Sequence, residues 1–368
     1  MSEPIGTPSE SERAVATARE KYHCPACGAE AQWNPDKHAL ICPFCGTESA
    51  VVLSARTAGT EIAEHDLAEA LRGVGAVRGW RADKSAVRCQ SCQAISVFDA
   101  STVGRRCDFC GSTQLVPYEQ TDDAFTPESL LPLKISESQA RDLIRGWYRR
   151  VWFAPNKLAL RALTDTAKGV YLPYWTFDAS AQASWTADSG TYYYVRESGK
   201  NVRRVRWTPV SGELSHVFDD ALVSASTGVN ARLLRGVEPF PTDGLVPYDP
   251  GYLAGWTVER YQVDLATAAV RARELMETVL RQLCSSAVPG DTQRNLNVRA
   301  TFTNQRFKHI LVPVWLMTYT YAAKSYQVVV NGATGRVNGS RPWSWVKITL
   351  LVLVVAIVLV LFGLSQNR

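Results

Sequence analysis

Cys24-Pro-Ala-Cys27 and Cys42-Pro-Phe-Cys45 lie fourteen residues apart near the N-terminus, and the same spacing recurs in Cys89-Gln-Ser-Cys92 and Cys107-Asp-Phe-Cys110. Every cysteine of the second cluster lies 65 positions after its counterpart in the first. Two cysteines separated by two residues direct both sulfurs into one corner of a tetrahedron, and two such knuckles complete the four-thiolate shell that Zn²⁺ prefers. The sequence therefore predicts two structural zinc ions per chain, one in each cluster.

Glycines support this interpretation. Gly46 and Gly111 follow the second knuckle of each cluster, and Gly28 follows the first knuckle of the first cluster. A glycine there lets backbone N–H groups turn back toward the thiolates without a clash from a Cβ atom. The second cluster departs from the pattern, because Gln93 stands at the position that corresponds to Gly28. Disulfides or redox thiols are the alternative, but two copies with one internal spacing favour metal.

Length and composition describe an ordinary folded protein. The 368 residues leave room for two or three domains, and the net charge of +5 does not by itself indicate a nucleic-acid-binding protein. The ninth cysteine, Cys284, falls in a predicted helix, where we expect a small core residue. Thiolate zinc sites fit a reducing compartment, so the clusters are expected to face the cytoplasm.

The C-terminus is predicted to anchor the chain in a membrane. Residues 348-364 are apolar and uncharged, and with Trp345 and Val346 they reach the length that crosses the hydrocarbon core of a bilayer. More basic residues precede this stretch than follow it, so the positive-inside rule places the N-terminal part in the cytoplasm. We expect a tail-anchored, single-pass protein of the cell membrane.

Composition also predicts the domain boundaries and the fold class. The predicted order is a disordered N-terminus (1-20), zinc ribbon 1 (21-54), a linker with a short helix (55-86), zinc ribbon 2 (87-116), a second linker (117-134), an α+β domain (135-342) and a transmembrane tail anchor (343-368). The fold class is thus two small zinc-ribbon β modules plus an α+β domain with an antiparallel sheet, ending in a single C-terminal transmembrane helix. Leu172-Pro-Tyr-Trp175 and Val312-Pro-Val-Trp315 each follow a helix and open a run of strands, which suggests two related halves. Their prolines suggest strand starts or edges.

Local patterns predict individual elements. Residues 60-72 form a short helix with Thr60 as its N-cap and a solvated His65. Ser136 and Gln139 form a capping box before a helix whose arginines lie on one face. A β-hairpin joins 192-195 to 202-207, and its arginines lie near Tyr and Trp, a pattern that binds single-stranded nucleic acid but is more often a solvated sheet face. Asp264 caps a long helix that ends near Ser286.

No catalytic constellation is recognisable. The histidines are scattered, without an HExxH motif, and no glycine-rich phosphate loop occurs. Zinc held by four thiolates has no open position for water or substrate. His216 with Asp219 and Asp220 can in principle bind a metal, but polar loop residues commonly do not. We expect no enzymatic activity and no small-molecule substrate.

These features together resemble a family of bacterial TFIIB-type zinc-ribbon membrane proteins, the YdjG-like group, which are often mislabelled as primosomal or helicase proteins. The motifs that carry the resemblance are the two ribbons, the helix from Glu61, Tyr171-Leu-Pro-Tyr-Trp-Thr-Phe-Asp178, Gly251-Tyr-Leu-Ala-Gly-Trp256, Val312-Pro-Val-Trp315, Asn331-Gly-Ala-Thr-Gly335 and the apolar tail. The resemblance implies a non-enzymatic, membrane-anchored adaptor or scaffold that recruits SPFH-domain or PspA-type membrane-stress proteins at the cytoplasmic face.

Two other functions stay open at this point. Zinc ribbons occur in nucleic-acid-binding proteins, so a membrane-tethered nucleic-acid-binding protein is the alternative, although neither ribbon carries a basic face beyond Arg88, Arg105 and Arg106. A chaperone or lipid sensor that uses the arginines of the helix after Ser136 is the third hypothesis.

Overall fold

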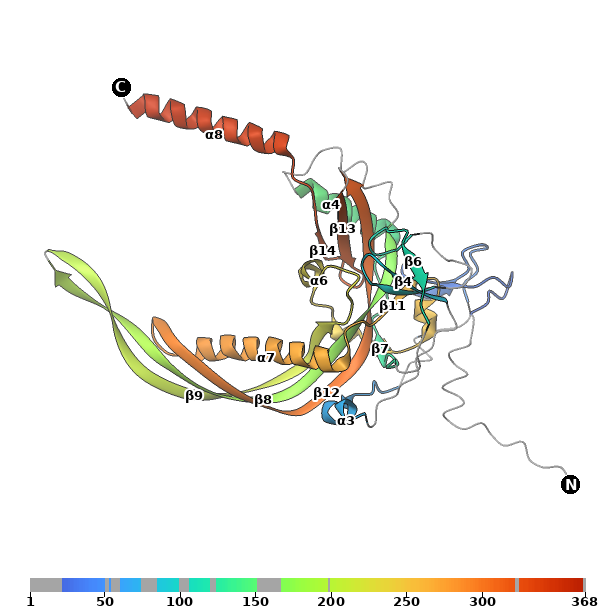
Figure 1. Ribbon diagram of the computed structural model, residues 1–368, viewed down its shortest axis with the longest axis horizontal. Coiled ribbons are helices and arrows are strands. Elements are labelled where there is room, and N and C mark those ends of the chain that lie inside the picture. Colours follow the sequence, from blue (N-terminus) through green and yellow to red (C-terminus); the bar gives the residue numbers. More distant parts are fainter. Residues whose placement is uncertain are drawn as a thin grey trace.

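One large β-sheet organises the chain (Figure 1). The structure is a computed structural model that describes residues 22–49, 53, 60–73, 85–98, 106–119, 124–150, 167–197, 199–321 and 324–366. The strands are β1 (Gln32–Asn34), β2 (Ala39–Ile41), β3 (His65–Asp66), β4 (Ser85–Cys89), β5 (Ile95–Phe98), β6 (Leu115–Pro117), β7 (Ser129–Leu130), β8 (Lys168–Glu197), β9 (Lys200–Ser224), β10 (Val246–Pro247), β11 (Thr257–Arg260), β12 (Thr292–Tyr321), β13 (Lys324–Asn331) and β14 (Val337–Gly339).

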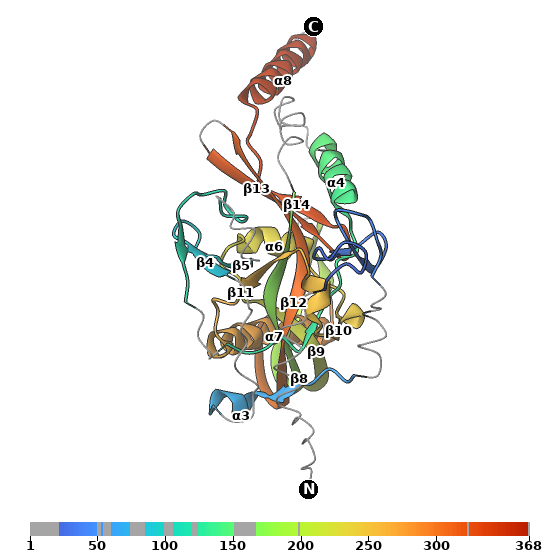
Figure 2. The same ribbon diagram turned by 90° about the vertical axis from the view of Figure 1, so that its right-hand side faces the viewer.

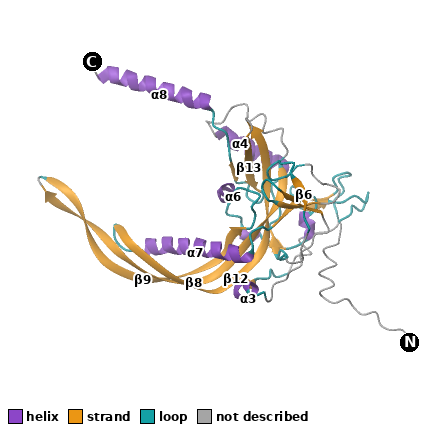
Figure 3. Ribbon diagram, viewed as in Figure 1, coloured by secondary structure: helices purple, strands orange, loops and turns teal. Residues whose placement is uncertain are grey.

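In the part of the chain that the structure describes, the helices lie around this sheet (Figure 3). They are α3 (Leu67–Leu71), α4 (Glu137–Arg150), α6 (Ala231–Val237), α7 (Leu265–Ala287) and α8 (Trp345–Gln366), with the 3-10 turns η2 (Thr242–Gly244) and η3 (Pro250–Leu253). The main path of the 12-stranded sheet runs β10-β7-β12-β8-β11-β5-β4-β6, while β1 and β2 form a sheet of their own. Residues 1-20, predicted to be disordered, lie outside the described part of the chain.

Three long strands form a curved blade that extends from the body of the molecule (Figure 1). The blade consists of β8, β9 and β12, with 30, 25 and 30 residues. Helix α7 lies along its concave side and packs against a stripe of alternate alanines on β8, where small side chains let the helix approach closely. The buried face of α7 repeats every three or four residues and consists of Leu265, Ala268, Ala272, Met276, Leu280 and Cys284. Cys284 is therefore a core residue, as expected.

Two prolines lie inside the long strands rather than at strand starts or edges, where we expected them. Pro173 lies in β8 where the neighbouring strand changes from β11 to β9, and Pro313 lies in β12 where it changes from β7 to β13. Where one neighbouring strand ends and the next begins, the hydrogen bonds between strands are interrupted on that side. A proline, which has no N–H to donate, is therefore tolerated there. The proline carbonyls are used, because Ala225 N donates to Pro173 O at 3.0 Å and Gly332 N donates to Pro313 O at 2.9 Å.

The predicted fold class is wrong in two respects. Strands β4 and β5 of ribbon 2 join the large sheet through β11, so this ribbon is not a module beside a separate α+β domain. The sheet is mixed rather than antiparallel, because β11 runs parallel to β8 and β7 runs parallel to β12. The physical reason is that a four-cysteine ribbon is too small to bury a core of its own and shares the core of the sheet.

The C-terminal helix also requires a correction. Among the residues that the structure describes, no helix has the length and the hydropathy of a membrane span. This overturns the predicted transmembrane tail anchor at 343-368, the integral membrane partner and the cell-membrane localisation that rested on it.

Two helix starts confirm the predicted caps. At α4, Ser136 N donates to Gln139 Oε1 at 3.0 Å and Gln139 N donates to Ser136 Oγ at 3.4 Å, the reciprocal pattern of a capping box. At α7, Asp264 Oδ1 accepts from Thr267 N at 2.8 Å. The helix predicted from Thr60 is shorter than expected.

His65 explains why that helix is short. His65 and the following residue pair with β12 as strand β3, so the helix α3 begins only at Leu67. His65 is not solvated as predicted: its Nε2 lies 2.8 Å from Glu128 Oε1, and the two side chains are 16% and 8% exposed. Glu128 Oε2 also accepts from His309 N at 2.6 Å. The hydrogen bond with Glu128 raises the pKa of His65.

This contact predicts a pH-dependent stability. A histidine with a raised pKa in the folded state stabilises that state below its ordinary pKa of about 6.5, and the contribution is lost as the pH rises through the folded-state pKa. The difference in unfolding free energy between the wild type and His65→Gln should therefore grow as the pH falls from about 8 to about 5.5. Urea unfolding at several pH values measures it, and a constant difference would refute the assigned pair.

Candidate metal centres

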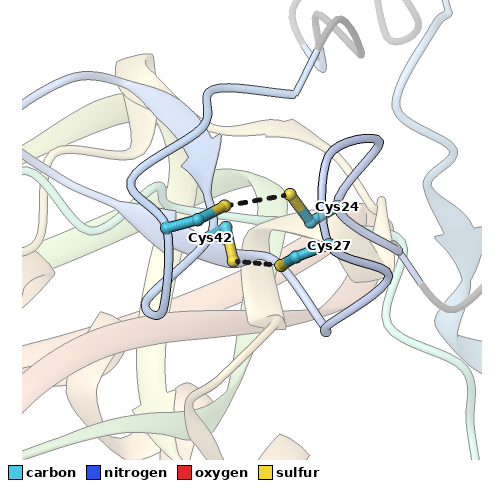
Figure 4. Close-up of side chains that lie close together, drawn as sticks. Cys24, Cys27 and Cys42 are labelled. Carbon is cyan, nitrogen blue, oxygen red and sulfur yellow. Dashed lines mark hydrogen bonds between the residues drawn. The ribbon is translucent and has the colours of Figure 1, made fainter.

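The first cysteine cluster brings four sulfurs together around the β1–β2 hairpin (Figure 4). Cys24 Sγ lies 3.4 Å from Cys45 Sγ, and Cys27 Sγ lies 3.5 Å from Cys42 Sγ. All four Sγ atoms lie within 4.8 Å of one another. The hairpin holds the two knuckles next to each other, because Trp33 of β1 pairs with Leu40 of β2, two residues before Cys42.

The knuckles close through backbone hydrogen bonds that need a left-handed residue. Gly28 N donates to Cys24 O at 2.9 Å, and Gly46 N donates to Cys42 O at 3.0 Å. Both glycines have positive φ, +74° and +73°, a conformation that residues with a Cβ atom rarely adopt. The glycines that follow the knuckles are therefore required by geometry, as the sequence predicts.

The second cluster repeats this geometry with one substitution. Cys89 Sγ lies 3.6 Å from Cys110 Sγ and Cys92 Sγ lies 3.7 Å from Cys107 Sγ. Gln93 takes the place of the missing glycine and adopts a φ of 62°. Its amide side chain donates to the carbonyl of Gln90 at 2.8 Å, a local bond that helps to hold the strained position.

The sulfur separations fit a tetrahedral metal and not a disulfide. A disulfide would bring two sulfurs to about 2.05 Å, whereas the separations between paired sulfurs are 3.4 to 3.7 Å. Four thiolates about 2.3 Å from a central Zn²⁺ would lie about 3.8 Å apart. All eight cysteines are free thiols. Each cluster is therefore a compact four-sulfur site that fits an ion of the size of Zn²⁺.

In each cluster, neighbouring groups lower the pKa of one thiol, while the pKa of another thiol is raised. The Thr47 hydroxyl lies 3.1 Å from Cys45 Sγ and lowers the pKa of that thiol to about 6. In the second cluster, the hydrogen bond with the Cys92 thiol lowers the pKa of Cys107 to about 5. Because the thiolate is the form that binds metal, each cluster offers a prepared ligand at neutral pH.

Ribbon 2 is fixed to the sheet by its second knuckle. The Phe109 side chain is fully buried, and its carbonyl accepts from Thr318 Oγ1 at 2.9 Å and from the amide of Gln327. Asp108 Oδ2, beside it, accepts from Thr257 Oγ1 at 3.0 Å. The knuckle thus contacts β11, β12 and β13 together, and its cysteines line a core of the sheet.

Ribbon 1 docks on the opposite face through tryptophans (Figure 2). Trp33 Nε1 donates to Leu133 O at 3.1 Å, and Trp256 Nε1 donates to Trp33 O at 3.2 Å. Tyr252 packs edge-on against Trp33 with ring centroids 4.7 Å apart. Ribbon 1 therefore packs on the segment Gly251-Tyr-Leu-Ala-Gly-Trp256. The sequence alone did not predict this contact.

The two ribbons differ at equivalent positions. Phe44 and Phe109 each precede the last cysteine of their cluster, 65 positions apart. Phe109 is 0% exposed, whereas Phe44 is 82% exposed. The same ring that fixes ribbon 2 to its own chain therefore points into solvent on ribbon 1.

A third group of potential metal ligands lies on the blade and consists of carboxylates. Asp178, Asp219 and Asp220 offer carboxylate oxygens within 4.8 Å of one another, and His216 is not part of the group. Lys308 Nζ lies 2.7 Å from Asp220 Oδ1. Because this ammonium already supplies a positive charge to the carboxylates, we assign no metal to them.

Glu259 is a buried acid next to the second cluster that the sequence analysis did not single out. Its side chain is 0% exposed, and burial raises its pKa to about 8, with Cys107 acting in the same direction. A Cβ atom on Gly228 would lie 2.7 Å from Glu259 Oε1, so only glycine fits there. Nothing in the strand sequence Thr-Val-Glu-Arg distinguishes this residue.

Comparison with known proteins gives one distant relationship. The chain is 22% identical over 328 residues to the uncharacterized protein YdjG of Bacillus subtilis (strain 168), an alignment that covers 89% of this chain and 91% of that protein. No family model matches the chain, and no solved structure matches it. The similarity confirms the coarse part of the expected resemblance, a relationship to YdjG, and carries no activity with it.

The unequal roles of the clusters predict unequal effects of losing one ligand. Cys27→Ser and Cys92→Ser should each lose one bound metal ion per chain. Cys92→Ser should lower the unfolding free energy by about 3 kcal/mol or more, because strands β4 and β5 lose their hold on the sheet. Cys27→Ser should cost clearly less, because the two strands of ribbon 1 form a sheet of their own and are not paired with the large sheet.

Elemental analysis and chemical unfolding of the two variants measure these effects. The serine variants are matched, since both replace the fourth residue of a Cys-X-X-Cys knuckle. Equal losses of stability would contradict the inference that only ribbon 2 is part of the main sheet.

Proposed function

We propose that this chain is a non-enzymatic scaffold that binds partner proteins through a zinc ribbon held rigidly on a large sheet. Each chain carries two structural Zn²⁺ ions, with Cys24, Cys27, Cys42 and Cys45 as ligands in ribbon 1 and Cys89, Cys92, Cys107 and Cys110 in ribbon 2. Four thiolates saturate zinc, so the metal supplies shape and stability rather than an open coordination position for substrate.

The observation that carries this proposal is the contrast between Phe44 and Phe109. Ribbon 2 demonstrates how such a knuckle engages protein: the ring enters an apolar core and the carbonyl beside it accepts two hydrogen bonds. Ribbon 1 has the same knuckle with its ring 82% exposed. An exposed aromatic side chain on a small module is typical of the anchor residue of a protein interface. Ribbon 1 is therefore the partner-binding surface and ribbon 2 is the structural one.

Rigid docking of ribbon 1 supports the same assignment. The hydrogen bonds of Trp33 and Trp256 hold it on the sheet before any partner binds. A module whose backbone is already held in place loses little backbone conformational entropy on association, so each of its contacts contributes more affinity.

The zinc content of the purified full chain tests the first part of the proposal. Two zinc ions per chain are expected by elemental analysis, each surrounded by four sulfurs in X-ray absorption spectra.

Phe44→Ser tests the second part. Cells that produce tagged wild type, Phe44→Ser or Val217→Ser are crosslinked, and the captured proteins are quantified. Val217 is a matched control because it is also strongly exposed, at 72%, but lies on the blade. Specific partners should decrease about tenfold or more with Phe44→Ser, in keeping with the ~2 kcal/mol of an interface hot spot, and should be retained by Val217→Ser. Identical partner sets for all three proteins at equal zinc content would refute the assignment.

A further inference from the structure

The hairpin at the end of the blade carries a basic and aromatic surface that is separate from the zinc ribbons. Strand β12 starts at Thr292, opposite Gly190, so β8 and β9 continue beyond this point as a two-stranded ribbon (Figure 1). We call residues 191-207 the finger. It projects from the far end of the blade, away from both cysteine clusters (Figure 1).

The finger concentrates positive charge. Five basic residues against one acid give it a net charge of +4, while the whole chain has a net charge of +5. The basic residues are Arg196, Lys200, Arg203, Arg204 and Arg206, and the acid is Glu197, which pairs with Arg204. Most of the net positive charge of the chain therefore lies on the finger.

Aromatic rings alternate with these arginines. The Arg203 guanidinium lies 4.4 Å from the centroid of the Tyr192 ring, and that of Arg206 lies 5.5 Å from the Tyr193 ring. At the base of the finger, Arg294 lies 4.2 Å from the Trp207 ring. Each contact places a guanidinium group over an aromatic ring.

Both faces of the finger carry this pattern. Directly opposed residues of an antiparallel pair share a face, so Tyr194 and Arg203 lie on one face, and Tyr193 and Arg204 lie on the other. Tyr194 is 67% exposed and Tyr193 is 38% exposed. The finger therefore presents free ring surface and guanidinium groups on both sides.

We propose that the finger binds single-stranded nucleic acid. Guanidinium groups neutralise phosphates, and exposed tyrosine rings and arginine planes stack on unpaired bases, the combination that binds single strands without base specificity. Bases inside a duplex are already stacked on each other, so the rings favour a single strand over a duplex.

The shape of the finger argues against a lipid surface as its ligand. A hairpin that inserts into a bilayer needs an apolar tip, whereas the described residues at this tip include Glu197 and Lys200. Neither face is purely apolar, because each one carries arginine. Charge and stacking geometry together therefore select nucleic acid.

Fluorescence anisotropy with the full chain and a labelled 30-nucleotide oligothymidine tests the proposal. The wild type should bind with an affinity that falls steeply between about 50 and 200 mM salt. The variant Arg203→Ala/Arg204→Ala/Arg206→Ala should bind about tenfold more weakly or worse. Its salt dependence should be shallower by about 2 in log–log slope, because each neutralised phosphate of a single strand contributes about 0.7.

A matched triple variant controls for net charge. Arg271→Ala/Arg281→Ala/Arg299→Ala removes three exposed arginines outside the finger, two on α7 and one on β12, and it should change the affinity less than twofold. Tyr194→Ala leaves the charge intact and should weaken binding about fivefold through lost stacking. Circular dichroism of each variant confirms that the fold is retained.

Several results would overturn the proposal. These are no binding of the oligothymidine by the wild type, equal losses in the two triple variants, an unchanged affinity in Tyr194→Ala, or equally tight binding of a 30-base-pair duplex. Capture by phosphatidylserine-containing vesicles without oligothymidine binding would instead identify a lipid surface as the ligand.

Discussion

The insertion of the second cysteine knuckle into the central sheet is the contact on which the rest of the structure depends. Phe109 enters a core between the strands while its carbonyl binds β12 and β13, so the knuckle joins segments that are more than 200 positions apart in sequence. Strand β5 pairs with β11 and strand β4 pairs with β5, so the loop that the four sulfurs close begins directly at the large sheet. A metal held there would therefore stabilise a whole sheet and not one small module.

The same construction explains why two nearly identical motifs have different roles. Ribbon 1 and ribbon 2 share the spacing of their cysteines and the ring before the last one, but they contact opposite faces of β8 and β12. Tyr171 faces the core beneath ribbon 1, whereas its neighbours Val170 and Leu172 face the core beneath ribbon 2. One ribbon uses its aromatic ring internally and the other leaves it exposed. A repeated motif has thus provided one ribbon whose ring is built into the sheet and one whose ring is exposed.

Local chemistry was predictable from the sequence, and long-range arrangement was not. The cysteine spacing predicted both four-sulfur clusters, and Ser136 and Asp264 marked the helix starts, because each depends on residues a few positions apart. The motifs around Leu172 and Val312 were recognised as similar to each other, but not as paired residues of neighbouring strands. Strand pairing across that sequence distance has no local signal. The apolar tail was predicted to cross a membrane from its length and hydropathy, but among the described residues no helix has both properties of a membrane span.

Hydrogen–deuterium exchange of the full chain before and after removal of its metal tests the account most directly. If metal in the second cluster fixes that ribbon to the sheet, chelation should increase exchange in β4, β5, β11 and the adjoining start of β8. The finger, which is far from either cluster, should change little. Loss of the metal with unchanged protection of β11 and the start of β8 would contradict the account.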